Sequence, residues 1–190
     1  MPIVYINRNE EKYYLKKALT KTGKIQHCAV KDTKKINPDD LVEEIPPGYE
    51  FYEEPQDARV YFRKIPVYNI SDDEVEIIDS VMKKHETVSH YIIDKGVNDI
   101  TVNIMLIDKN DEDYFHEFLK KLKKFRRYES VLKFGKEGKR YIEYTVQRFC
   151  YRSSVDDWIV LERSKDLKYL AQKYCYHIDK DSLYDFYKCL

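Results

Sequence analysis

Alternating apolar and polar positions predict β-strands in several parts of the chain. The predicted strand segments are 59–65, 87–94, 98–107 and 157–162. In the third segment one face is apolar, and it is formed by Ile100, Val102, Ile104 and Leu106. Pro66 ends the first segment, and Gly96 suits a turn between the second and the third. Neighbouring strands joined by such short turns indicate antiparallel pairing.

Two further segments predict β-hairpins. Residues 12–31 contain two apolar stretches on either side of Gly23, which suits the positive φ of a tight turn. A helix over 10–22 is an alternative, because Tyr14, Leu15, Ala18 and Leu19 also fit helical spacing; we favour the hairpin. Residues 129–152 predict a second hairpin that turns at Gly135-Lys136-Glu137-Gly138 and has Ile142, Tyr144 and Val146 on its core face.

Helical patterns occupy three segments. Ser71 to His85 is the best marked, because Ser71 and Glu74 form a capping box and an apolar stripe follows at helical spacing. A second helix is predicted over 111–127, with lysines and Arg127 on its polar face. Residues 165–188 predict one broken helix or two short ones.

The order of these elements predicts an α+β fold with an antiparallel sheet built from hairpins and about three to four helices. Prolines at 38, 46, 47 and 55 exclude a long element between 37 and 57. A linker near 66–70 divides the chain into an N-terminal hairpin and strand subdomain, 1–66, and an α+β domain, 67–190. A single domain is the alternative.

Composition points to a folded cytoplasmic protein. The chain has 190 residues, of which 43% are hydrophobic and 36% are charged, and 18 are tyrosines. It has no signal-peptide pattern at its start and no apolar stretch near the roughly 18–20 residues that a membrane span needs. The four cysteines are scattered without a CxxC pair, which predicts reduced thiols in the cytosol and no membrane partner.

The charges are sorted into blocks although the formal net charge is zero. Residues 37–79 hold 13 acidic and 3 basic residues, and residues 116–152 hold 12 basic and 4 acidic residues. Such asymmetry often reflects a binding partner. It is the main functional signal in this sequence.

The basic segment predicts a non-catalytic module that binds nucleic acid through a helix and a hairpin at 116–152. Cations displace counterions from phosphates, and aromatic faces stack on the bases of single strands. The candidate binding residues are Lys120, Lys123, Lys124, Arg127, Lys133, Lys136, Lys139, Arg140, Tyr141 and Arg148. A charged, solvated helix face and hairpin tip is the ordinary alternative.

The acidic and basic blocks also predict a second function of equal weight. Opposed patches could pair between copies of the chain or with a protein partner, so that the asymmetry serves interaction or self-assembly. A hydrolase or nuclease without a recognisable motif is the third hypothesis, suggested by Asp94-Lys95 and Asp99.

Motifs for catalysis, cofactors and metals are weak. The sequence contains no GxSxG, HExxH, P-loop or GxGxxG pattern, which predicts no cofactor and makes enzymatic activity uncertain. Zinc would need ligands such as Cys150, Cys175, His177 and Cys189, or His85 with His90, yet only Cys175 and His177 are close in sequence. Buried free cysteines are the commoner explanation, so we expect no metal site.

Three segments of the first third carry a family resemblance. They are Thr20-Lys21-Thr22-Gly23-Lys24, Pro47-Gly48-Tyr49-Glu50-Phe51-Tyr52-Glu53-Glu54-Pro55 and Val60-Tyr61-Phe62-Arg63-Lys64. Together they resemble the N-terminal part of a group of uncharacterised bacterial proteins. Because that group has no known activity, the resemblance supports the hairpin and implies nothing about function.

Overall fold

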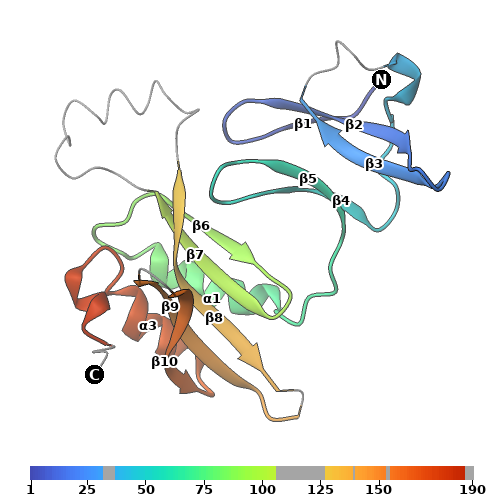
Figure 1. The fold of residues 1–190 in the computed structure, drawn as a ribbon. Helices are drawn as coiled ribbons and strands as arrows, with labels where there is room; N and C mark the ends of the chain where they lie inside the picture. The colour runs from blue at the N-terminus through green and yellow to red at the C-terminus, as the bar shows by residue number, and fades with distance from the viewer. Residues whose placement is uncertain (32–36, 106–126, 139, 153–154, 187–190) are drawn as a thin grey trace, which may run out of the picture. The chain divides into compact units, whose positions relative to one another are not determined.

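The computed structural model describes residues 1–31, 37–105, 127–138, 140–152 and 155–186 (Figure 1). It contains two compact units, one formed by Met1–Pro66 and the other by residues 67–105 and 128–186. The described residues form ten strands in three antiparallel sheets and only two α-helices. The predicted α+β fold with three to four helices is therefore wrong, and the described chain is mainly β.

The helix count was too high at the C-terminal end. There the chain forms α3 (Leu167–Cys175) and then only a 3₁₀ turn, η4 (Asp181–Tyr184). The helix predicted over 111–127 lies outside the described residues. No helix in the described part of the chain is long and apolar enough to cross a membrane.

The first unit holds two small sheets and a 3₁₀ turn, η1 (Pro38–Asp40). Its strands are β1 (Val4–Ile6), β2 (Lys12–Leu19), β3 (Ile25–Val30), β4 (Tyr49–Glu53) and β5 (Val60–Lys64). The predicted hairpin is confirmed as β2 and β3, and Gly23 adopts a φ of 77° in its turn. The alternative helix is wrong, because residues 12–19 form a strand paired with β3, in which Tyr13 and Leu15 are buried while Tyr14 and Lys16 between and after them are only half-buried.

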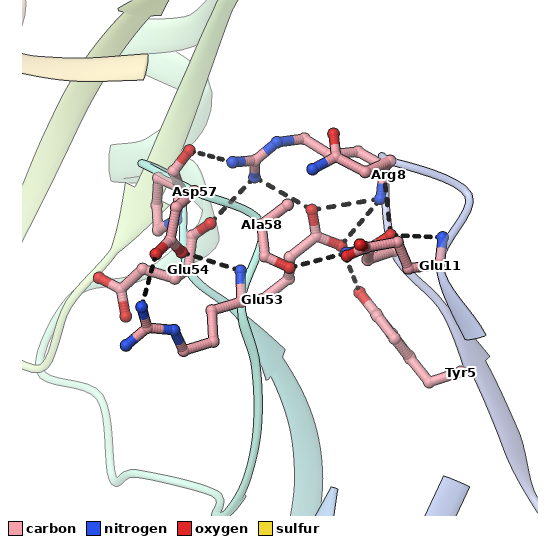
Figure 2. Close-up of polar contacts among 11 residues, drawn as sticks. Tyr5, Arg8, Glu11, Glu53, Glu54, Asp57 and Ala58 are labelled. Atoms are coloured by element: carbon pink, nitrogen blue, oxygen red, sulfur yellow. Dashed lines mark hydrogen bonds and ion pairs between the residues drawn. The ribbon is translucent and has the colours of Figure 1, made fainter. Parts of the chain in front are cut away.

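A cluster of polar contacts joins the turn after β1 to the turn after β4 (Figure 2). Arg8 Nη1 donates hydrogen bonds to Glu53 Oε1 and to the Glu54 carbonyl, each at 3.0 Å. Asn7 Nδ2 donates to the Ala58 carbonyl at 2.8 Å. Because the Arg8 and Glu53 side chains are only 21% and 15% exposed, water weakens their attraction less than it weakens a surface pair.

The second unit is a five-stranded antiparallel sheet with α1 (Asp72–Met82) and α3 packed on one face (Figure 1). In the spatial order of the sheet, the strands are β10 (Val155–Ser164), β9 (Glu143–Arg152), β8 (Tyr128–Glu137), β7 (Asp99–Met105) and β6 (Tyr91–Lys95). The core between helices and sheet includes Ile78, Val102, Leu132, Phe134, Val146 and Leu170. We call this side the helix-covered face.

The second hairpin turns later than the sequence predicted. Gly135 lies inside β8, paired with both Asp99 and Thr145, and the chain reverses between β8 and β9. A Cβ on Gly135 would lie 2.7 Å from Thr145 Oγ1, so this glycine allows close strand contact and does not form the turn. Ile142 is 43% exposed and not part of the core, whereas Val146 is fully buried as predicted.

Glu74 connects the start of α1 to the sheet. The predicted capping box is confirmed: Ser71 caps the helix, and Glu74 Oε2 accepts the Ser71 backbone N–H at 2.7 Å. Glu74 Oε1 also forms an ion pair with Lys136 Nζ at 2.8 Å and accepts a hydrogen bond from the Tyr144 hydroxyl. Burial alone would raise the pKa of the Glu74 carboxyl, but its donors hold that pKa below its ordinary value.

Two other tyrosines join a helix to the sheet in the same way. Tyr91 of β6 donates to Asp79 of α1 at 2.9 Å, and Tyr174 of α3 donates to Glu162 of β10 at 2.8 Å. Burial and the accepting carboxylate raise the pKa of each phenol, as for Tyr144, to about 12. All three phenols are therefore protonated donors at neutral pH.

We predict that Glu74→Gln lowers the free energy of unfolding at pH 7 by about 1–3 kcal/mol, because Lys136 and Tyr144 lose a charged acceptor. Glu76→Gln is the matched control on the same helix. Its side chain is 70% exposed, so we expect a change within about 0.5 kcal/mol. Urea denaturation of the three proteins measures both effects, and equal losses in the two variants would contradict the role given to Glu74.

The stabilisation by Glu74 depends on pH in a defined direction. Its folded-state pKa lies below the ordinary 4.5, so the contribution is fully present above pH 4.5 and is lost as pH falls through the folded-state pKa. We expect the stability difference between wild type and Glu74→Gln to shrink below pH 4.5. A difference that stays constant from pH 7 to pH 3 would argue against a depressed pKa.

Candidate functional site

The second unit contains a pocket of about 330 Å³ between α1 and α3. Its walls come from the end of α1 with the turn after it, and from α3 with the turn after that helix. We call it the α1–α3 pocket. The lining residues that carry charge or an aromatic ring are Lys84, His85, Glu86, Lys168, Tyr176 and Lys180.

The two helices place these side chains by burying their opposite faces. Ile78 of α1 and Leu170 of α3 lie in the shared core, which leaves the polar stripe of each helix at the surface. After α1 the backbone tightens, with the Lys84 N–H bonded to the Val81 carbonyl at 3.1 Å. That turn directs Lys84 and His85 to the pocket.

Charge in the pocket is mainly positive. Three lysines, Lys84, Lys168 and Lys180, line it together with one carboxylate, Glu86. The Nζ atom of Lys180 lies 3.3 Å from the centre of the Tyr176 ring, a cation–π contact that holds the ammonium group at the pocket wall. A pocket lined by three lysines favours a carboxylate or a phosphate over a neutral or cationic ligand.

His85 is the only imidazole in the wall, and its geometry is structural. Its Nδ1 accepts the backbone N–H groups of Thr87 and Val88, each at 3.2 Å, so the neutral ring carries its proton on Nε2. Burial and the charge of Lys180 lower the pKa of His85, partly opposed by the Cys175 carbonyl. Nε2 is itself buried and, within the described chain, makes no hydrogen bond of ordinary geometry. A neutral ring held in this way is poorly suited to exchange protons with a ligand.

Those of the predicted nucleic-acid-binding residues that the structure describes do not all lie on one face. Lys120, Lys123, Lys124 and Lys139 lie outside the described residues. Arg127, Arg140 and Tyr141 are exposed, the last two between β8 and β9. Lys133 lies on the sheet face opposite the helices, whereas Lys136 and Arg148 lie on the helix-covered face. The two-residue period of a strand places Lys133 and Lys136 on opposite faces of the sheet.

Ion pairs inside each unit take up much of the acidic block. Glu50 pairs with Arg63 and Glu53 with Arg8 in the first unit. In the second unit, Glu74 pairs with Lys136 and Asp79 with Lys83. The acidic charge available to a partner is therefore smaller than the sequence suggests, and the predicted assembly function stays untested.

The residues considered above as zinc ligands can be compared with the structure in part. Cys175 is fully buried, and burial raises the pKa of its thiol to about 12, so it stays protonated. Among the residues that the structure describes, no three His, Cys, Asp or Glu side chains are placed to hold a metal ion. Cys189 lies outside them.

The chain matches no protein-family model, and neither a curated protein nor a solved structure is significantly similar to it. The resemblance of its first third to an uncharacterised bacterial family thus stays a prediction. Function has to be inferred from the side chains of the chain itself.

The electrostatic link between Lys180 and His85 gives a direct check on the pocket. We expect Lys180→Gln to raise the pKa of His85, because a nearby positive charge that disfavours the imidazolium is removed. Proton NMR titration of the His85 ring measures the change. Lys165→Gln, an exposed lysine outside the pocket lining, is the control and leaves the His85 pKa unchanged. An identical His85 pKa in Lys180→Gln and wild type would mean that Lys180 does not face this ring.

Proposed function

We propose that the protein is a non-catalytic binding module whose α1–α3 pocket holds a small molecule bearing a carboxylate or phosphate group. The observation that supports this proposal is the convergence of Lys84, Lys168 and Lys180 on one pocket with Glu86 as the sole lining carboxylate. The His85 ring is neutral and fixed in place, and neither of its nitrogens is available to accept a proton from a ligand. This arrangement therefore suits the binding of a ligand better than catalysis.

The size and the remaining lining agree with such a ligand. About 330 Å³ lies at the lower end of the roughly 300–1,000 Å³ typical of small-molecule sites. Ser80 and Gln172 add neutral hydrogen-bonding groups beside the three ammonium groups. The lysines would attract the anion, and the neutral groups would orient it.

The proposal includes a reducing compartment, the cytosol. Cys28, Cys150 and Cys175 are free thiols in the described chain, and no disulfide links them. A buried protonated thiol such as Cys175 is also slow to oxidise, because the thiolate is the reactive form.

We predict that a variant carrying Lys84→Gln, Lys168→Gln and Lys180→Gln binds small anions at least about tenfold more weakly than wild type, since each lost contact is worth roughly 1 kcal/mol or more. Isothermal titration at low salt with pyrophosphate, citrate and adenosine monophosphate measures the affinities. Lys17→Gln, Lys21→Gln and Lys165→Gln together make the same change in net charge at exposed positions outside the pocket.

Equal loss of affinity in both triple variants would mean that overall charge, and not the pocket, attracts the anions. Failure of wild type to bind any of the three ligands at millimolar concentration would refute the proposed chemistry of the site.

Nucleic-acid binding is the second candidate, and one arrangement favours it. On the sheet face opposite the helices, Lys133 Nζ lies 4.1 Å from the centre of the Trp158 ring, and Phe149 contacts that ring edge-on at 5.4 Å between centroids. Proteins that bind single-stranded nucleic acids use aromatic rings to stack on the bases and nearby cations to contact the phosphates.

Trp158 is the sole tryptophan of the chain, so its fluorescence tests this candidate directly. If bases stack on it, single-stranded oligonucleotides will quench the emission in a salt-dependent manner, and Lys133→Gln will weaken the effect. The triple lysine variant of the pocket should be quenched like wild type. Unchanged emission at low salt would remove nucleic acid as a ligand of this face.

A further inference from the structure

Arg148 is a buried cation in the middle of β9. Only 5% of the residue is exposed. It pairs with Leu132 of β8 and Ile159 of β10, so its side chain lies on the helix-covered face and not on the protein surface. Phosphates on a nucleic-acid backbone therefore do not reach it as they would reach an exposed arginine.

The contacts of Arg148 leave its charge uncompensated. Nη1 donates a long hydrogen bond of 3.4 Å to the Phe149 carbonyl, and the guanidinium carbon lies 5.3 Å from the centre of the Tyr184 ring. The Nε–H is buried and has no hydrogen-bond acceptor, and within the described ranges Arg148 forms no ion pair with a carboxylate. Buried arginines are usually paired, because an isolated buried charge is costly.

A small cavity lies beside this guanidinium. It has a volume of about 30 Å³, and its wall includes Arg148, Ser130, Phe149, Leu183 and Tyr184. That volume is enough for one group of about the size of a water molecule or somewhat larger. Glu129 also lines the cavity, but it makes another interaction and is not ion-paired with Arg148.

We propose that this cavity is a binding site for one small anionic group, a chloride ion or a carboxylate, held by the Arg148 guanidinium. The site is separate from the α1–α3 pocket and does not depend on the function proposed for that pocket. The planar guanidinium carries several N–H donors and a permanent positive charge, the features that bind a carboxylate or a halide. Tyr184, 63% exposed, covers one side of the cation and leaves the bound anion close to the surface.

Thermal unfolding tests the proposal. Sodium chloride or sodium acetate replaces sodium HEPES at constant ionic strength, so that only the small anion changes. We expect the Tm of wild type to rise by a few degrees and to saturate, as for a ligand that binds only the folded state. Arg148→Met should lose this rise and should be no less stable than wild type in HEPES, because the substitution removes an unpaired buried charge. Arg140→Met, at an exposed arginine, should respond like wild type.

The α1–α3 pocket is excluded by repeating the titration with the variant that lacks Lys84, Lys168 and Lys180. The rise in Tm should persist there, so loss of pocket binding and loss of the Arg148 site are distinguishable. Stabilisation by chloride points to a free ion, and stabilisation by acetate alone points to the carboxylate of a larger molecule. An equal anion response in wild type and Arg148→Met would overturn the proposal.

A direct measurement keeps the test independent of how well the variant folds. Chloride-35 NMR line broadening by wild type, reversed by added acetate, would support the site. The absence of both broadening and stabilisation in wild type would refute it.

Discussion

The second unit depends on the carboxylate of Glu74. This one group caps the N-terminal turn of α1, pairs with Lys136 of β8 and accepts a hydrogen bond from the Tyr144 hydroxyl of β9. The start of α1 is thereby joined to a hairpin more than 60 residues further along the chain, which helps to orient α1 on the sheet. Because α1 packs against α3, the geometry of the α1–α3 pocket depends indirectly on a residue that does not line it.

Local sequence features predicted local structure well. The capping box at Ser71 and Glu74 is complete within four residues, so the start of α1 could be read without knowing the rest of the fold. The hairpin around Gly23 was also correctly predicted. Local sequence did not predict the role of Gly135, because that role depends on Thr145 of the neighbouring strand, which leaves no room for a side chain at position 135.

The residues that line the α1–α3 pocket were harder to predict for the same reason. Lys84 lies in the turn after α1 and Lys168 lies in α3, and nothing in the local pattern of either segment indicates that both reach one pocket. The basic residues of the second hairpin lie close together in sequence. In the fold, Lys133 faces away from the helices, Lys136 binds Glu74, and Arg148 is buried. Similar side chains thus have three different roles, decided by strand register and burial.

The phenol–carboxylate pairs that join helices to sheet have a consequence for how this chain tolerates change. The phenols of Tyr91, Tyr144 and Tyr174 have pKa values raised to about 12. The carboxyl groups that accept their hydrogen bonds, those of Asp79, Glu74 and Glu162, have lowered pKa values. Each pair therefore keeps one fixed charge state across the whole neutral range. Surface lysines and carboxylates elsewhere in the unit can then be exchanged during evolution without altering the anchoring of its helices. Helices anchored to the sheet in this way allow the surface charge to change while the fold is kept.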